Sequence, residues 1–68
     1  MTNTALLNEI IEESGLRRSK IAKTIGITRE GLWLKLNNKN EFKASEIKAL
    51  CELLNIKSLR VKERVFFA

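Results

Sequence analysis

The side chains able to bind or react are mostly cations in the middle of the chain. Residues 17–43 carry eight Lys and Arg against two Glu, whereas residues 1–16 carry three Glu and no base. The net charge of +5 is therefore concentrated in the middle of the chain. An acidic segment next to a basic one is typical of a protein that presents one face to a polyanion such as nucleic acid. The alternative is that the lysines form an ordinary solvated surface.

Side chains suited to catalysis or to metal binding are scarce. The chain has no His and one Cys, Cys51. It has neither a glycine-rich phosphate loop nor a pair of carboxylates in a context that suggests a cleft. A zinc site would need ligands that the sequence does not provide. We therefore expect a binding protein and not an enzyme, with no cofactor, no metal and no small-molecule substrate.

The cysteine usage and the first residues predict a cytoplasmic protein. Cys51 has no partner for an internal disulfide, and the segment MTNTALLNEIIEES is acidic, unlike a secretion signal. No apolar run approaches the roughly 20 residues that cross a bilayer. A module that lies on a membrane surface would need a basic amphipathic helix, whereas the first predicted helix is acidic. We expect no contact with a membrane.

The apolar spacing predicts an all-α fold of four to five short helices. The chain has three Gly and no Pro, and its apolar residues recur at helical intervals. Asn3 or Thr4 can cap the first helix, and Gly15 can end it. The predicted helices cover residues 4–14, a short segment that ends at Gly26, residues 29–37 and residues 44–54.

The tail of residues 57–68 ends in β-branched and aromatic residues with charges between them. This composition favours a short edge strand or an extended arm. Phe66 and Phe67 are too apolar for a free tail, so we expect them to cover the domain's own core or to contact a second copy.

A more specific pattern spans residues 18–37. Two helices that meet at a tight turn need a small residue where they approach each other and a residue that tolerates positive φ in the turn. Ala22 and Gly26 meet these needs. The apolar residues that would lock the two helices together are Ile21, Ile25, Ile27 and Leu32. The segment therefore predicts a helix-turn-helix.

The same segment resembles the Cro and λ-repressor-like family of phage and bacterial regulators, whose motif carries Ala and Gly four positions apart, as Ala22 and Gly26 are here. The stretch NNKNEFKASEIKALCELLNI looks like the loop and following helix of small phage-type members, so the resemblance covers residues 4 to about 56. It implies a λ-repressor-like DNA-binding domain, with residues 1–68 as one domain and double-stranded DNA as the partner.

In this family the second helix of the motif lies in the major groove, where its outward residues read base edges. If Leu32 and Leu36 face inward, helical spacing places Arg29, Glu30, Trp33 and Asn37 on one contiguous stripe, with Leu34 next to it. The candidates for base contact are Arg29, Glu30, Trp33, Leu34 and Asn37. For Trp33 the alternatives are stacking on the DNA backbone, packing on the preceding helix or contact with a partner. Gly31 either allows a close approach of the backbone or is tolerated without a role.

Phosphate contacts are expected from groups that flank the groove. The candidates are Arg17, Arg18, Thr28, Asn38, Lys39 and Lys43. Arg17 and Lys43 stand where many family members have a capping Ser or Thr, so they leave the N-terminal amides of their helices free for a phosphate. The alternative is that Ser19 or a shift of the backbone provides the cap.

These features together predict a transcriptional regulator of the Cro-like kind, a repressor or a related protein. We expect it to bind a two-fold operator as a homodimer, with half-sites about one helical turn apart. The alternative is a helix-turn-helix scaffold that binds another regulatory protein, as an antirepressor, a modulator or an antitoxin does. The basic residues of the segment 17–43 favour DNA, whereas outward-facing Trp33 and Leu34 would suit a protein interface.

Overall fold

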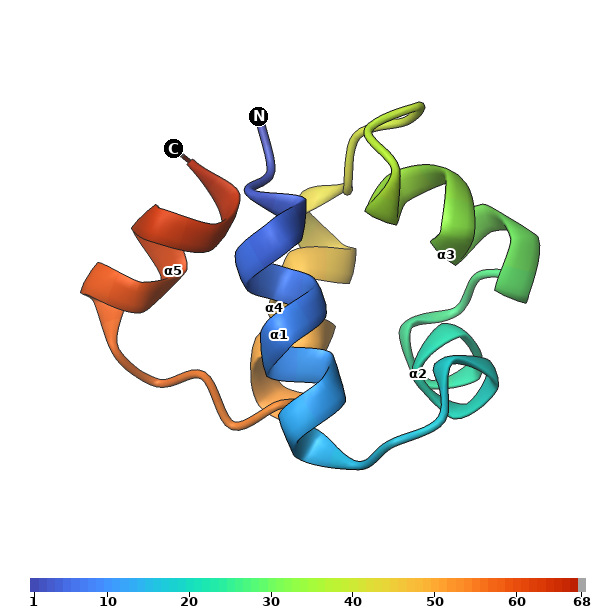
Figure 1. Cartoon of the computed structure of the whole chain (residues 1–68), viewed down its shortest axis with the longest axis horizontal. Coiled ribbons are helices and arrows are strands. Elements are labelled where there is room, and N and C mark those ends of the chain that lie inside the picture. Colours follow the sequence, from blue (N-terminus) through green and yellow to red (C-terminus); the bar gives the residue numbers. More distant parts are fainter. Residues whose placement is uncertain (68) are drawn as a thin grey trace.

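The computed structural model describes residues 1–67, all but the last. Within this range the chain forms five α-helices and no strand (Figure 1). Their bounds are Thr4–Ser14 (α1), Arg18–Ile25 (α2), Arg29–Leu36 (α3), Ala44–Leu53 (α4) and Leu59–Phe66 (α5). The all-α prediction and its first four helices are confirmed, although the predicted ends of α3 and α4 lie one residue too far along the chain.

A polar cap and a glycine set the two ends of α1. The side-chain oxygen of Asn3 accepts a hydrogen bond from the amide of Leu6 at 3.1 Å. Asn3 is therefore the cap, and Thr4 is already the first helical residue. At the other end Gly15 takes a left-handed conformation, with φ of +72°, which a residue with a Cβ adopts only at a cost.

The turn between α2 and α3 depends on a second left-handed glycine. Gly26 has φ of +84°, as its position in the predicted motif requires. The amide of Ile27 then donates to the carbonyl oxygen of Ala22 at 2.9 Å, and the Ile27 side chain packs against the core. The backbone hydrogen bond and the apolar packing of Ile27 thus both hold the turn of residues 26–28 in place. Together they fix the orientation of α3 relative to α2.

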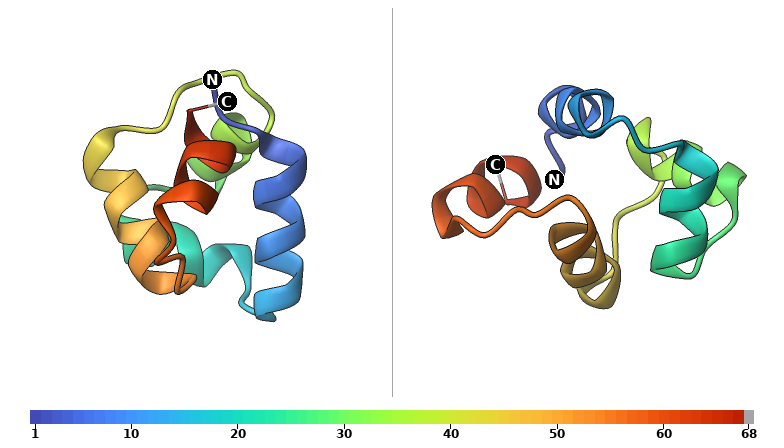
Figure 2. Two further views of the ribbon diagram at one scale, coloured as in Figure 1. Left: turned by 90° about the vertical axis from the view of Figure 1, so that its left-hand side faces the viewer. Right: turned by 90° about the horizontal axis from the view of Figure 1, so that it is seen from below.

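The core is shared by all five helices. α2 packs on α3 and α4, while α1 packs on α3 and α5 (Figures 1 and 2). Each helix contributes at least one fully buried side chain, and these are Leu7, Ile11, Ile21, Leu32, Leu50 and Val65. Burial of one such side chain stabilises the fold by about 1.5–3 kcal/mol. Cys51 is buried with them, whereas Ile47 and Leu54 are half-buried.

The prediction of a strand or an arm for the tail is wrong, because the tail forms helix α5. Ser58 caps this helix by accepting a hydrogen bond from the amide of Val61 at 3.4 Å. Val65 and Phe66 are buried, and the ring of Phe66 meets that of Phe42 edge to face, with centroids 6.1 Å apart. Burial of this helical face outweighs the preference of β-branched residues for strands.

The segment before α1 is tied to the end of α5. The amide of Asn3 donates to the carbonyl oxygen of Val65 at 2.6 Å, and Thr2 is buried. Both figures accordingly place the first residues next to α5 (Figures 1 and 2). Phe67 is 67% exposed, so only the first of the two phenylalanines covers the core. Residue 68, the last of the predicted tail, lies outside the described residues.

Candidate nucleic-acid interface

Four of the five residues predicted to contact bases lie on the exposed face of α3. Leu32 and Leu36 are buried, as predicted, so they anchor the helix and turn its other side outward. The exposed residues are Arg29, Glu30, Trp33 and Asn37. Leu34 differs from them because it is half-buried. The exposed fraction of Trp33 is 57%, which leaves most of the indole available to a ligand.

The start of this helix is fixed by Thr28 and Gly31. The Thr28 hydroxyl oxygen accepts a hydrogen bond from the Gly31 amide at 2.9 Å. A Cβ on residue 31 would lie 3.1 Å from that oxygen, so the Thr28 side chain would have to shift by a few tenths of an ångström. The glycine spares the cap this shift. Thr28, predicted as a phosphate contact, keeps its own hydroxyl proton available for donation.

The turn after α3 carries Asn37, which is the C-cap of the helix, and two further candidates, Asn38 and Lys39. The side-chain amide of Asn37 donates to the carbonyl oxygen of Trp33 at 2.8 Å, which holds this side chain against the end of the helix. Asn38 takes the left-handed conformation, with φ of +58°, and the Lys39 amide then donates to the carbonyl oxygen of Leu34 at 2.8 Å. The Lys39 side chain is exposed. The turn thus presents an ammonium group directly beside the exposed face of α3.

The helices α2 and α4 both begin at a basic residue that does not cap them. Arg17 is the N-cap of α2 and Lys43 that of α4, and neither makes a side-chain capping bond. Within residues 1–67 the Ser19 hydroxyl accepts no hydrogen bond from an amide at the start of α2. Arg17 thus leaves these amides without a side-chain acceptor, and their use as a phosphate site stays a prediction. The start of α4 differs from that of α2 in one hydrogen bond, because the backbone amide of Lys43 donates to the Glu46 carboxylate at 2.8 Å.

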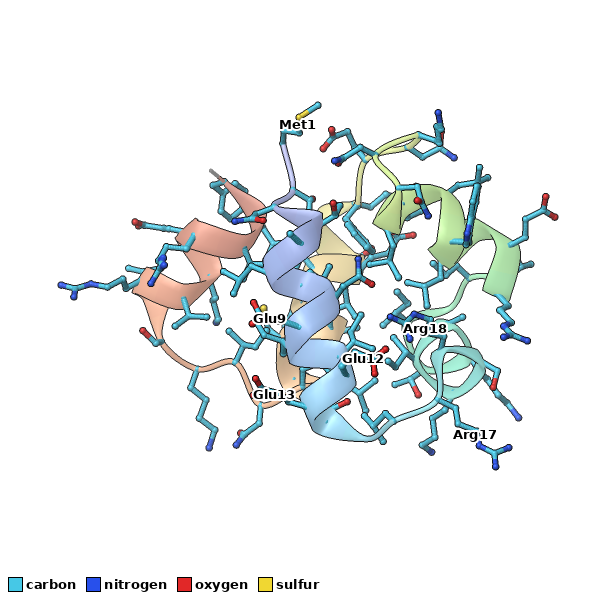
Figure 3. The ribbon with its side chains drawn as sticks, in the orientation of Figure 1. Met1, Glu9, Glu12, Glu13, Arg17 and Arg18 are labelled. Atoms are coloured by element: carbon cyan, nitrogen blue, oxygen red, sulfur yellow. The ribbon has the colours of Figure 1, made fainter. Side chains whose placement is uncertain are left out.

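The Arg18 side chain is held by two side chains of α1, whereas that of its neighbour Arg17 is not. One guanidinium nitrogen, Nη1, lies 3.3 Å from Oε1 of Glu12, and Nη2 donates to the side-chain oxygen of Asn8 at 3.0 Å (Figure 3). Since the Glu12 side chain is 72% exposed, this ion pair contributes no more than about 1 kcal/mol. Arg17 points into solvent at the same corner (Figure 3). Arg17 is therefore the cation that is available there.

Two adjacent hollows join the start of α2 to the outer face of α3. One, of about 320 Å³, is lined among others by Arg17, Arg18 and Arg29. The other, of about 300 Å³, is lined among others by Arg18, Arg29, Trp33 and Asn37. Since Arg18 and Arg29 line both hollows, these five residues form one continuous region, which we call the α2–α3 surface. Its guanidinium groups and amide are donors suited to phosphates and base edges.

The remaining candidates lie outside these hollows. Neither hollow is lined by Thr28, Glu30, Leu34, Asn38, Lys39 or Lys43. Of these six residues, all but the half-buried Leu34 are exposed. The structure thus brings together three arginines, the tryptophan and one asparagine, and it leaves the other six candidates outside that group.

A buried ion pair between α3 and α4 was not predicted from the sequence. Lys35 of α3 is only 9% exposed, and its Nζ lies 2.8 Å from Oε1 of Glu46 in α4. The same ammonium donates to the carbonyl oxygen of Glu41 at 3.1 Å and lies 5.9 Å from the centre of the Phe42 ring. The available signal was spacing, because Lys35 follows the inward-facing Leu32 by three residues. Lys35 therefore adds nothing to the solvent-exposed positive charge.

The electrostatic environment of Glu46 favours its ionised form. Burial by itself would raise the pKa of this carboxyl. The hydrogen bonds from the Lys35 ammonium and the Lys43 amide, with the charges of both lysines, outweigh burial and hold the pKa below its usual value. Glu46 is thus ionised at neutral pH, and its contact with Lys35 joins the end of α3 to the start of α4.

Within residues 1–67, no three His, Cys, Asp or Glu side chains come together in a way that could hold a metal ion. No helix in that range is both long and apolar enough to cross a bilayer. Comparisons with protein-family models, with curated proteins and with solved structures find no match to this chain.

Proposed function

We propose that the chain is a sequence-specific DNA-binding regulator of the Cro and λ-repressor-like kind. In this proposal α2, the turn of residues 26–28 and α3 form the helix-turn-helix, and α3 lies in the major groove. The observation that carries it is the continuous α2–α3 surface, in which three arginines adjoin an exposed helix face that is anchored by two buried leucines. The activity is binding, without catalysis or a cofactor.

Each part of the α2–α3 surface has a role in this proposal. Arg29, at the first turn of α3, takes a guanine edge, and Asn37 and Trp33 contact the same groove further along the helix. Arg17 and the free amides at the start of α2 hold a phosphate, and Lys39 holds another beyond the end of α3. The protein acts where the DNA is, in the cytoplasm of the host cell.

The proposal includes a homodimer on a two-fold operator. A single domain of this size makes few phosphate contacts, and tight specific binding by such domains uses two copies on two half-sites. The two α3 helices would then enter the major groove about one helical turn apart.

Trp33 provides the first test, since it is the only tryptophan and lies on the proposed recognition helix. We expect random-sequence duplex DNA to change its fluorescence at low salt, and the change to collapse steeply as salt is raised. Light scattering in the same titration separates binding from aggregation. No binding at low salt would contradict the proposal.

The substitution Arg29→Ala tests base contact. We expect specific binding to an operator selected from a random pool to weaken by about 1–3 kcal/mol for each bound subunit, roughly 5- to 150-fold. The thermal midpoint should not change, since Arg29 is exposed. Arg60→Ala, the same change at an exposed position of α5, is the matched control and should leave the affinity unchanged. Equal affinities of Arg29→Ala and the parent would remove Arg29 from the readout.

The substitution Lys39→Ala tests phosphate contact. We expect it to weaken binding to the operator and to random DNA alike, and to reduce the slope of log affinity against log salt by about 0.9 for each lost contact. Lys57→Ala, in the loop between α4 and α5, serves as the control. A loss confined to the operator would show that Lys39 reads sequence instead.

A second candidate is favoured by one observation, the 57% exposure of Trp33 beside the half-buried Leu34. An exposed tryptophan is typical of protein interfaces, so the same face could bind another regulatory protein. If the parent protein does not bind DNA at low salt, this candidate takes the place of the first.

A further inference from the structure

A groove separate from the α2–α3 surface lies between α4 and the segment that leads into α5. It has a volume of about 600 Å³, and the apolar side chains along it include Ile47, Cys51 and Ile56. Cys51 and Ile56 are nearly fully buried, and Ile47 is half-buried. No residue of the α2–α3 surface lines this groove. Figure 2 shows α4 and α5 as neighbours joined by that segment.

Three lysines surround this apolar floor, and we call the whole the lysine groove. Lys48 comes from α4, Lys57 from the segment before α5, and Lys62 from α5. One carboxylate, that of Glu52, also lines the groove, so its local net charge is +2. The ion pairs of residues 1–67 are Arg18–Glu12 and Lys35–Glu46, so these three ammonium groups take part in none.

The thiol on the floor keeps the groove apolar. Burial raises the pKa of the Cys51 thiol, and the nearby Lys62 ammonium opposes this effect without reversing it. The thiol is therefore neutral at neutral pH and behaves as a small apolar group. The groove thus combines an apolar floor with a rim of cations that lack protein partners.

We propose that the lysine groove binds an acidic amphipathic segment of a partner protein. Apolar side chains of that segment pack on the half-buried Ile47, and its carboxylates pair with the lysines of the rim. Nucleic acid would satisfy the lysines but leave the exposed part of Ile47 in water. An uncharged apolar helix would cover the floor but leave the lysines unpaired. Only a partner with both features complements both parts of the groove.

This inference does not rest on DNA binding by the α2–α3 surface. The two regions use different residues, so one molecule can occupy both at once. A chain that binds DNA through α3 would then hold its protein partner beside that DNA.

The test is a titration of the isotope-labelled protein, followed by the chemical shifts of its backbone amides. The probe is a synthetic helical peptide with leucines on one face and glutamates on both flanks. We expect saturable shifts centred on the residues of the lysine groove, at peptide concentrations up to about 1 mM. No shifts at that concentration, or shifts centred elsewhere, would overturn the proposal. A peptide with the same leucines but with lysines on its flanks should not bind, and equal binding of both peptides would also overturn it.

Charge reversal on the rim sharpens the test. The variant Lys48→Glu with Lys57→Glu should bind the acidic peptide about tenfold more weakly, because two attractions become repulsions. Both residues are exposed, so the fold should persist, which circular dichroism checks. The matched control is Lys20→Glu with Lys23→Glu, the same change at two exposed positions of α2, and it should bind the peptide like the parent. Equal losses in the two variants would show only a general charge effect and overturn the proposal.

Other occupants give distinguishable results. Random duplex DNA should not shift the residues of the lysine groove, and a shift there would make the groove a nucleic-acid site. Concentration-dependent shifts in the groove without peptide would identify a second copy as the occupant. Either result would overturn the proposal. A failure of the parent to bind DNA at all would leave the peptide result standing.

Discussion

Phe66→Ala is expected to lower the free energy of unfolding by about 3–5 kcal/mol. The Phe66 ring is 3% exposed and meets the Phe42 ring edge to face, so its removal leaves a cavity between α5 and the rest of the core. A domain of this size has a total stability of roughly 3–10 kcal/mol, and the loss is therefore a large part of it. Urea denaturation followed by far-ultraviolet circular dichroism measures the change.

The adjacent phenylalanine is the control for this prediction. Phe67 is 67% exposed, and Phe67→Ala should change the stability by no more than about 0.5 kcal/mol. Similar small effects at both positions would mean that α5 does not pack on the core in solution. If Phe66→Ala does not fold, Phe66→Leu, which keeps most of the volume, should lose about 1.5 kcal/mol or less and allows the measurement.

The second large effect is expected for Glu46→Ala, at about 3 kcal/mol. The substitution leaves the Lys35 ammonium buried without its carboxylate, and it also removes the acceptor of the Lys43 amide. Since about 12–24 °C of thermal midpoint corresponds to such a loss in a small domain, a melting curve suffices to detect it. This expected loss of stability is at the lower end of the range for breaking a buried ion pair, because the long Lys35 side chain can turn toward solvent.

The control for Glu46→Ala replaces both charges at once. Lys35→Met with Glu46→Leu should be much closer to the parent in stability, because no unpaired charge remains. If this double variant is as unstable as Glu46→Ala, packing and not charge is what the carboxylate provides.

The pH dependence of the same variant has a defined sign. The Glu46 pKa is lower in the folded chain than its usual value of 4.5. The stability that its charge contributes is therefore complete above that value and is lost as the pH falls through the folded-state pKa. The difference in unfolding free energy between the parent and Glu46→Ala should narrow in acid. A difference that does not change between neutral and acidic solution would contradict the role of the ion pair.

The first four helices could be predicted because their signals are local. Asn3, Gly15 and Gly26 each act within a few residues of their own position, and the structure uses all three as predicted. The fifth helix could not be predicted in this way. Its β-branched and aromatic residues favour a strand locally, and the tertiary contact of Phe66 with Phe42 decides the outcome.

The same distinction applies to the candidate site. The exposed face of α3 followed from helical spacing once Leu32 and Leu36 were taken as inward. The partners of Arg18 and Lys35 did not follow, because Asn8 and Glu46 lie on other helices, ten and eleven residues away in sequence. Charge counted along the sequence therefore overstates the charge that the surface presents.

The cap of α3 couples two positions of the sequence. An alanine at position 31 would favour the helix by about 1 kcal/mol over glycine. Its Cβ would lie 3.1 Å from the Thr28 hydroxyl oxygen, so the cap would have to shift by a few tenths of an ångström, which offsets part of that gain. The alanine is therefore expected to stabilise the helix less while Thr28 is present than after that hydroxyl has been removed. A double-mutant cycle at positions 28 and 31 should show this coupling as a departure from additivity.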